Sequence, residues 1–290
     1  MTTLAHPRSR VVAARPARSL RPAPVATYVL LTAAGLVTLV PFGWVFAGAF
    51  RSTDEIRSDP GGWLPVHPTF DNFVRLFRDN GFAGYLGNSL LVAAMMVLGN
   101  LLFASMAGYA LAKLRFAGKR LVFGAVMVAL MVPFAATFVP QFVVTVNLGL
   151  VDTLPGIALP TVVLPIAVFV MRQFAQSLPD DLFDAARIDG AGELRIFGSI
   201  FLPLTGPALA TQAILTFLFS WNNFIWPLIV AQSDSTYTLP VGLAAASQQA
   251  HTTDYGLLLA GAVVVMLPVL VLFLLLQKYF IQGIAATGLK

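Results

Sequence analysis

The sequence predicts an all-α membrane protein with six transmembrane helices and a short charged helix between the fourth and the fifth. The composition is the first observation, because 58% of the 290 residues are hydrophobic and only 11% are charged. Soluble domains carry about 25% charged residues. The second observation is that six apolar stretches contain no Asp, Glu, Lys or Arg. Each has about the length that a helix needs to cross a bilayer, and a helix satisfies its own backbone hydrogen bonds in lipid.

The six stretches follow one another along the chain. They cover about residues 26–50, 88–112, 121–143, 154–171, 206–231 and 255–276. The first has about 25 residues, which is too long for the apolar core of a signal peptide. The second and the fifth contain Asn100 and Gln212, whose amides we expect to bridge neighbouring helices. Prolines in or beside the third to fifth stretches predict kinked helices around a pathway, at Pro133, Pro140, Pro155, Pro160, Pro165, Pro207 and Pro227.

The basic residues between the stretches predict the side of the membrane that each connection faces. Fourteen of the 18 Lys and Arg residues lie in the N-terminal tail, in the connections after the second and fourth stretches, and near the C-terminus. The other four lie in the long connection 51–87. Cytoplasmic connections of membrane proteins are enriched in Lys and Arg, so we expect both termini and the charged helix to be cytoplasmic.

The Arg-rich N-terminus is expected to be separate from the membrane domain. We expect residues 1–24 to form a disordered basic cytoplasmic tail and residues 25–290 to form the six-span domain. Attraction of the tail to anionic lipid explains its charge. Membrane lipid, and no nucleic acid, is therefore the expected partner of this segment.

The sequence argues against several kinds of active site. It contains no cysteine and only three scattered histidines, which argues against a metal site. The single Gly-Lys pair, Gly118-Lys119, is followed by Arg120, so there is no phosphate-binding P-loop. Neither H-E-x-x-H nor G-x-S-x-G is present, and we expect no catalytic residues. The apolar stretches hold no ionisable group for a proton-driven carrier, although a sodium site made of carbonyl groups stays open.

The charged segment between the fourth and fifth stretches has the pattern of a broken helix. Pro179 suits the first position of a helix, and the acidic pair Asp180 and Asp181 suits the first turn. Leu182, Ala185 and Ala186 are expected on one face, which would let another surface approach closely. Asp189-Gly190 is a helix-stop signal, and a second amphipathic stretch follows it. From these features alone, an ordinary interfacial helix and a functional one are equally good interpretations.

The segment "DAARIDGAGELRIFGSIFLP" (184–203) resembles the EAA motif of ATP-binding-cassette importer permeases. That motif reads E-A-A-x(3)-G-x(9)-I-x-L-P, and its spacing matches throughout, with Asp in place of the usual Glu at the first position. The matching residues are Asp184, Ala185, Ala186, Gly190, Ile200, Leu202 and Pro203. Residues 177–203 are called the EAA segment from here on.

Other stretches resemble the maltose-type permeases of the carbohydrate importer family. They are "GYALAKLRFAGK" (108–119), "MVPFAATFVPQF" (131–142), "NLGLVDT" (147–153), "WNNFIWPLIV" (221–230) and "KYFIQGIAATGLK" (278–290). The resemblance covers roughly residues 20–290, and it implies a bacterial inner-membrane permease for a sugar or oligosaccharide. A glycerol-phosphate-type solute is an alternative, and an autonomous ion-coupled carrier is an alternative from another class.

The resemblance also implies partners. In this family the EAA segment is a coupling helix that docks in a cleft of a cytoplasmic ATPase subunit. Two permeases, usually a heterodimer, work with two ATPase subunits and an extracytoplasmic solute-binding protein. ATP and Mg would bind to the partner ATPase, and no cofactor is expected on this chain.

Candidate substrate contacts lie in the fifth stretch, at Trp221, Asn222, Asn223 and Trp226. Amides can hydrogen-bond sugar hydroxyls, and an indole face can stack on a sugar ring. Two other interpretations stay open, because Trp is common at membrane interfaces and Asn can bridge helices.

Overall fold

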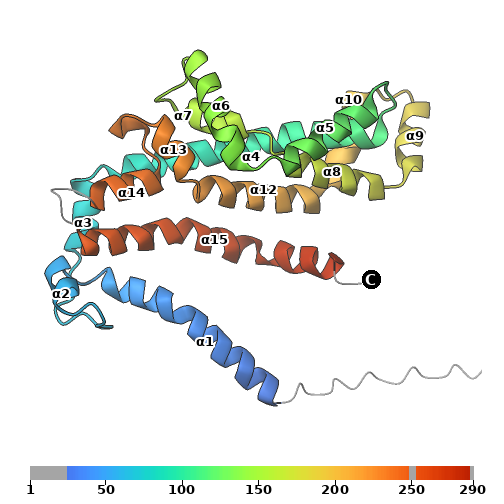
Figure 1. Cartoon of the computed structure of the whole chain (residues 1–290). Helices are drawn as coiled ribbons and strands as arrows, with labels where there is room; N and C mark the ends of the chain where they lie inside the picture. Colours follow the sequence, from blue (N-terminus) through green and yellow to red (C-terminus); the bar gives the residue numbers. More distant parts are fainter. Residues whose placement is uncertain (1–24, 248–252, 288–290) are drawn as a thin grey trace, which may run out of the picture. The chain divides into compact units, whose positions relative to one another are not determined.

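The computed structural model describes residues 25–247 and 253–287 (Figure 1). The described residues fall into two units, with the boundary between Trp44 and Val45. The first unit contains most of α1 (Val25–Gly48), a 24-residue apolar helix with Pro41 inside it. The predicted tail 1–24 lies outside the described residues. All remaining elements belong to the second unit.

The described part of the second unit is helical throughout, which agrees with the predicted all-α class. Its helices are α2 (Thr53–Ser58), α3 (Asp71–Arg78), α4 (Phe82–Lys113), α5 (Lys119–Met131), α6 (Phe134–Asn147), α7 (Leu154–Ala158), η1 (Leu159–Thr161), α8 (Pro165–Ser177), α9 (Asp180–Ile188), α10 (Glu193–Ile196), η2 (Phe197–Phe201), α11 (Leu202–Leu204), α12 (Gly206–Trp221), α13 (Ile225–Val230), η3 (Asp234–Thr236), α14 (Leu239–Ser247) and α15 (Tyr255–Thr287).

Three of the described helices are individually long and apolar enough to cross a membrane, namely Thr27–Gly48, Phe82–Lys113 and Tyr255–Leu275. Three pairs of shorter helices bring the number to six if each bent pair counts as one span. The bend is 106° between α5 and α6, 46° between the α7–η1 segment and α8, and 79° between the segment Glu193–Leu204 and α12. The predicted stretches 121–143 and 154–171 are therefore each broken, as their prolines predict.

Prolines account for two of these breaks, as the sequence predicts. Pro133 precedes the first residue of α6, and Pro165 is the first residue of α8. Proline has no backbone N–H and disfavours a helical conformation in the residue before it, so a helix commonly ends there and a new one begins. The predicted stretch 206–231 also breaks, at residues 222–224 between α12 and α13.

Helix α4 is the central element of the second unit, with α8 and α12 packed along it (Figure 1). Small residues allow the close approach. A Cβ atom added to Gly108 would lie 2.6 Å from the Cβ of Met171 and 2.9 Å from the backbone nitrogen of Arg172. Membrane helices often pack through small residues because lipid provides no hydrophobic force between helices. Which end of α4 faces the cytoplasm stays a prediction from the distribution of Lys and Arg.

A buried amide joins the three central helices, as expected for Asn100. Its side-chain nitrogen donates to Thr216 Oγ1 of α12 at 2.5 Å, and its oxygen accepts from the backbone N–H of Leu164 at 3.2 Å. Asn100 is 1% exposed, so both bonds are sheltered from competing water. The prediction that Asn100 bridges helices is confirmed.

Candidate functional site

The EAA segment lies at the end of α4 that contains Lys113, where α9 and α10 meet the end of α8 (Figure 1). It forms the broken helix that the sequence predicts. Helix α9 runs over Asp180–Ile188, a turn follows, and α10, a π-helical turn (η2) and α11 lead into α12. Pro179 occupies the N-cap position of α9 and not the predicted first helical position, which is taken by Asp180.

Gly190 closes the turn between α9 and α10. Its φ of +80° lies in the left-handed region that favours glycine. The N–H of Gly190 donates to the carbonyl of Arg187 at 3.0 Å, and the N–H of Ala191 donates to the carbonyl of Ala186 at 3.0 Å. This pair of bonds is a Schellman motif, which satisfies two of the last carbonyl groups of α9. The predicted helix stop at Gly190 therefore has a physical cause in the backbone.

The buried face of the EAA segment is made of apolar residues from both of its halves. Phe183, Ile196 and Phe201 are fully buried against Tyr109 and Met171, with Ala186 and Ile200 packed beside them. Leu182 and Ala185 are exposed, whereas Ala186 turns toward the buried cluster. The prediction grouped Ala185 and Ala186 on one face, but adjacent helical residues are turned by about 100° from one another.

The outer face of the segment consequently carries apolar side chains. Ile188 is 86% exposed, Leu194 is 82% exposed and Leu182 is 46% exposed. Ile188 lies just before the turn at Gly190, and Leu194 lies just after it at the start of α10. Of the other motif residues, Asp184 and Pro203 are exposed, and Leu202 is half-buried against the cluster around Tyr109.

Ion pairs connect the two halves of the segment. Arg187 Nη1 donates to Asp184 Oδ1 at 2.8 Å, and Arg187 Nε donates to Glu193 Oε1 at 2.8 Å. The bond to Glu193 is the largest of the effects that raise the pKa of Arg187, so this guanidinium stays charged. Asp184, the first residue of the motif, is thus held by Arg187 within the same helix.

Helix α4 supplies two further contacts that the sequence analysis missed. Tyr109 donates its hydroxyl to Glu193 Oε2 at 2.5 Å, and Lys113 Nζ donates to Asp180 Oδ1 at 2.5 Å. The hydrogen bond from Lys113 is the first cause that lowers the pKa of Asp180. The available signal was the spacing of Tyr109 and Lys113, which are four residues apart and therefore lie on one face of a helix.

The second candidate region is the break between α12 and α13. Both tryptophans of the predicted substrate pathway are buried at 1% exposure. The indole N–H of Trp221 donates to the carbonyl of Val265 at 3.0 Å, and that of Trp226 donates to the carbonyl of Ile157 at 3.2 Å. These bonds fix the two ends of the break to α15 and α7, so neither indole face is open in this conformation.

The two asparagines of the break are more accessible than the tryptophans. Asn222 is exposed, and its side-chain nitrogen donates to the carbonyl of Leu218 at 2.8 Å. Asn223 is half-buried, and its side chain makes no hydrogen bond within the described part of the chain. The break therefore brings two amides and unwound backbone together between anchored ends. The prediction that these four residues contact substrate stays a prediction.

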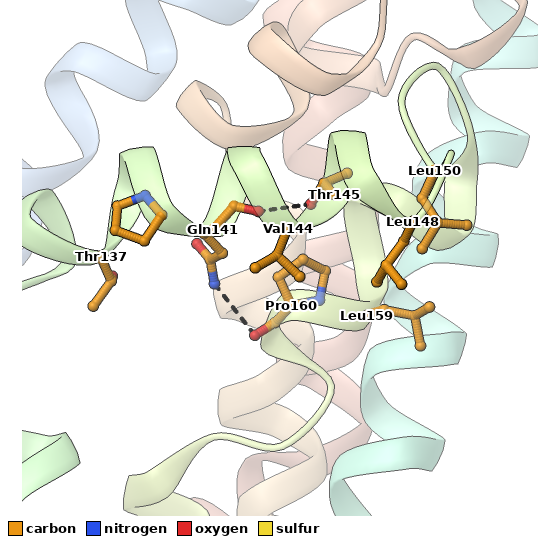
Figure 2. A pocket seen from close by; sticks show the side chains of 9 residues that line it. Thr137, Gln141, Val144, Thr145, Leu148, Leu150, Leu159 and Pro160 are labelled. Atoms are coloured by element: carbon orange, nitrogen blue, oxygen red, sulfur yellow. Dashed lines mark hydrogen bonds between the residues drawn. The ribbon is translucent and has the colours of Figure 1, made fainter.

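A separate hollow of about 400 Å³ lies between α6 and the α7–η1 pair (Figure 2). Its walls are mainly apolar. Gln141 Nε2 donates to the carbonyl of Pro160 at 3.3 Å, while its buried Oε1 has no hydrogen-bond partner among the described residues. A sugar needs several convergent polar groups, so this hollow suits a sugar less well than the 222–224 break does.

Comparisons with known proteins agree on the family. Residues 100–286 match the family model described as "Binding-protein-dependent transport system inner membrane component". The chain is similar to the arabinooligosaccharides transport system permease protein of Halalkalibacterium halodurans, at 42% identity over 258 residues, or 88% of this chain and 92% of that protein. It is also similar to the diacetylchitobiose uptake system permease protein of Streptomyces coelicolor, at 36% identity over 87% of this chain and 84% of that protein.

A solved structure extends the likeness to three dimensions. The crystal structure of a bacterial ABC transporter involved in the import of the acidic polysaccharide alginate contains a chain that matches with a TM-score of 0.77 and 26% identity. The match covers 88% of this chain and 95% of that chain. The chain therefore belongs to the binding-protein-dependent transport system inner membrane components, the permease subunits of ATP-binding-cassette importers.

Proposed function

We propose that this chain forms half of the translocation pathway for a sugar or oligosaccharide and that its EAA segment docks against a cytoplasmic ATPase. As a member of the permease family, the chain is a transporter subunit and not an enzyme. Relatives named for arabinooligosaccharides and diacetylchitobiose support a carbohydrate over a glycerol-phosphate-type solute.

The observation that carries the coupling proposal is the outer face of the EAA segment. Ile188 and Leu194 are more than four-fifths exposed although both are large and apolar. Charged residues flank them on a segment that begins with two aspartates, so lipid is a poor solvent for this surface. Exposed apolar patches with polar rims are typical of protein-protein contacts. We propose that Leu182, Ala185, Ile188 and Leu194 seat in the ATPase cleft.

The proposed assembly contains two permeases, this chain and a second six-span protein, with two copies of the ATPase. ATP and Mg bind to the ATPase, and an extracytoplasmic binding protein delivers the solute. In this proposal α12 belongs to the fifth span and the preceding segment 193–204 lies outside it, so six spans place both termini and the EAA segment on one side of the membrane. The Lys and Arg residues concentrated on that side assign it to the cytoplasm. Because the chain has no cysteine, single introduced cysteines would report this topology without background labelling of the permease.

The proposed substrate pathway passes the break at residues 222–224. Unwound segments within membrane helices offer backbone groups as well as side chains to a substrate. Asn222 and Asn223 are proposed to hydrogen-bond sugar hydroxyls. Trp221 and Trp226 are proposed to contact substrate only if the break opens during transport, and in this conformation they hold its two ends.

Gentle co-purification from native membranes tests the proposed function. We expect a P-loop ATPase, a second six-span protein and a binding protein to be identified by mass. The binding protein is then titrated with oligosaccharides and with phosphate esters, and binding of phosphate esters alone would replace the sugar by a glycerol-phosphate-type solute. A chain that purifies alone in several detergents, with nucleotide present, would contradict the importer assembly and favour an ion-coupled carrier.

A further inference from the structure

Tyr109 forms a direct link between the central helix α4 and the EAA segment. Its ring is 4% exposed and lies among Phe183, Phe197 and Phe201, with centroid separations of 6.1, 5.6 and 5.0 Å. Its hydroxyl donates to Glu193 Oε2 at 2.5 Å. A polar bond inside an aromatic cluster is directional, whereas the apolar contacts around it allow sliding.

The bond to Glu193 continues into the first half of the segment. Glu193 also accepts from Arg187, and Arg187 donates to Asp184. One unbroken series of bonds therefore runs from α4 through α10 and across the turn into α9. The series ends on the first residue of the EAA motif.

Lys113 makes a second link, one helical turn further along α4. Its ammonium group donates to Asp180 Oδ1 at 2.5 Å and to the carbonyl of Leu178 at 2.7 Å, and it lies 4.8 Å from the ring centroid of Phe183. The side chain of Lys113 is only 4% exposed. Lys113 thus holds the start of α9, while Tyr109 holds its end through Glu193 and Arg187.

Both links end on charged side chains of the EAA segment that line a hollow. Lys113, Asp180, Asp184, Arg187 and Glu193 line a hollow of about 960 Å³ between the α4–α5 connection and α9. On this side Arg187 Nη2 also donates to the backbone carbonyl of Lys113 at 3.5 Å, so polar bonds join α9 to the end of α4. They oppose a rotation of α9 that the apolar cluster on the other side would permit.

We propose that Tyr109 and Lys113 are positioning residues that make the EAA segment and the end of α4 move as one rigid body during transport. This inference rests on the proposed docking of the EAA segment against an ATPase. Displacement of α9 by the ATPase is then passed to α4, and through the close approach at Gly108 to α8. The links need not touch ATP or the substrate.

A cross-link that can be opened and closed tests whether the two parts move together. The chain has no cysteine of its own, so Lys113→Cys with Asp180→Cys introduces its only thiols. In the purified complex, the reduced double variant should lose coupling of ATP hydrolysis to transport by about two- to thirtyfold, the range found for residues that carry coupling. Closing the pair with a short cleavable bis-thiol linker should restore coupling.

Three outcomes would overturn the inference. In the first, the linker joins the two cysteines and transport stops until the linker is cleaved. In the second, the reduced double variant couples ATP hydrolysis to transport as well as the unmodified complex does. In the third, no short linker joins the two cysteines. The first would mean that α9 and α4 must separate in the cycle. If no ATPase accompanies the unmodified chain, the proposed function fails as well.

Tyr109→Phe tests the other link without removing the buried ring. We expect it to lower the stimulation of ATPase activity at saturating loaded binding protein, with no change in the half-saturating concentration of that protein. Tyr85→Phe is the matched control, because it removes a hydroxyl bond to Asp234 at the opposite end of the same helix. Equal stimulation in both variants would show that the Tyr109 bond has only a structural role.

Discussion

The backbone N–H of Ala191 donates to the carbonyl of Ala186 at 3.0 Å and closes the turn that separates the two halves of the EAA segment. This bond forms because Gly190, the residue just before Ala191, adopts a φ of +80°. Nothing lies within 4 Å of where a Cβ on Gly190 would be, so space does not restrict this position. The requirement for glycine is therefore a property of the backbone alone.

Gly190→Ala should weaken this turn by about 1–2 kcal/mol, the cost of a left-handed conformation for a residue with a Cβ. We expect normal membrane insertion and reduced binding-protein-stimulated ATPase activity in the complex. Gly192→Ala is the matched control, because Gly192 has a φ of −71° and also has open space around it. Equal activity in the two variants would contradict a role for the Gly190 conformation.

Asn100→Ala should destabilise the contact of α4 with α8 and α12. The substitution removes the partner of Thr216 at a buried site and leaves the N–H of Leu164 unpaired at a half-buried one. We expect a loss of about 1–2 kcal/mol, measured by unfolding in mixed micelles. Ser105→Ala is the control, because Ser105 is equally buried but bonds only to carbonyl groups of its own helix, at Leu101 and Leu102.

Much of the fold could be predicted from composition and proline positions, but the angles of the helix bends could not. Apolar runs identify candidate spans because lipid selects for them. Pro133 predicts a break in the third stretch, but not the 106° bend there or the contact of Phe138 in α6 with Trp226, a residue 88 positions later. The break at residues 222–224 has no proline in it, so its position could not be predicted from helix-breaking residues.

The candidate site was predictable only where local backbone rules decide it. Gly190 was identified correctly as a helix stop because the sequence Asp189-Gly190 carries that signal itself. The buried face of α9 could not be predicted, since Phe183 inserts beside Tyr109, a residue 74 positions earlier that no local pattern places there. The contacts of Glu193 with Arg187 and Tyr109 likewise depend on how the turn brings α10 back over α9.

Asp152 fastens the connection that follows α13. It accepts hydrogen bonds from the backbone N–H groups of Gln232 and Ser233 at 2.8 and 2.9 Å and from the hydroxyl of Thr236. It also adopts a φ of +58°, which Asp tolerates better than most residues.

Asp152→Asn keeps an acceptor and the backbone preference, while Asp152→Gly keeps only the backbone freedom. We expect the melting temperature to fall slightly for Asn and further for Gly, and an equal fall would show that the hydrogen bonds contribute nothing.

The contribution of Asp152 should also depend on pH in a definite direction. Hydrogen bonds from Thr236 first, then from Ser233 and the backbone of Gln232, hold the pKa of Asp152 well below its usual range. A depressed pKa gives stability that is present above the unfolded value of about 3.9 and is lost as the pH falls toward the folded value. The difference in melting temperature between the unmodified chain and Asp152→Asn should therefore be constant above about pH 5 and shrink below about pH 4. A difference that grows on acidification would contradict this assignment.

Asn223→Ala gives a cleaner test of the substrate pathway than any substitution of the neighbouring tryptophans. Trp221 is buried and bonded to α15, so Trp221→Ala should cost about 3–5 kcal/mol of stability and disturb transport whatever the substrate touches. Asn223 makes no side-chain bond within the described residues, so its loss should leave the melting temperature unchanged. If its amide binds a sugar hydroxyl during passage, transport at saturating loaded binding protein should fall about two- to tenfold, as expected for one lost hydrogen bond. Asn147→Ala, at the exposed C-terminal end of α6, serves as the control, and equal transport by both variants would remove Asn223 from the pathway.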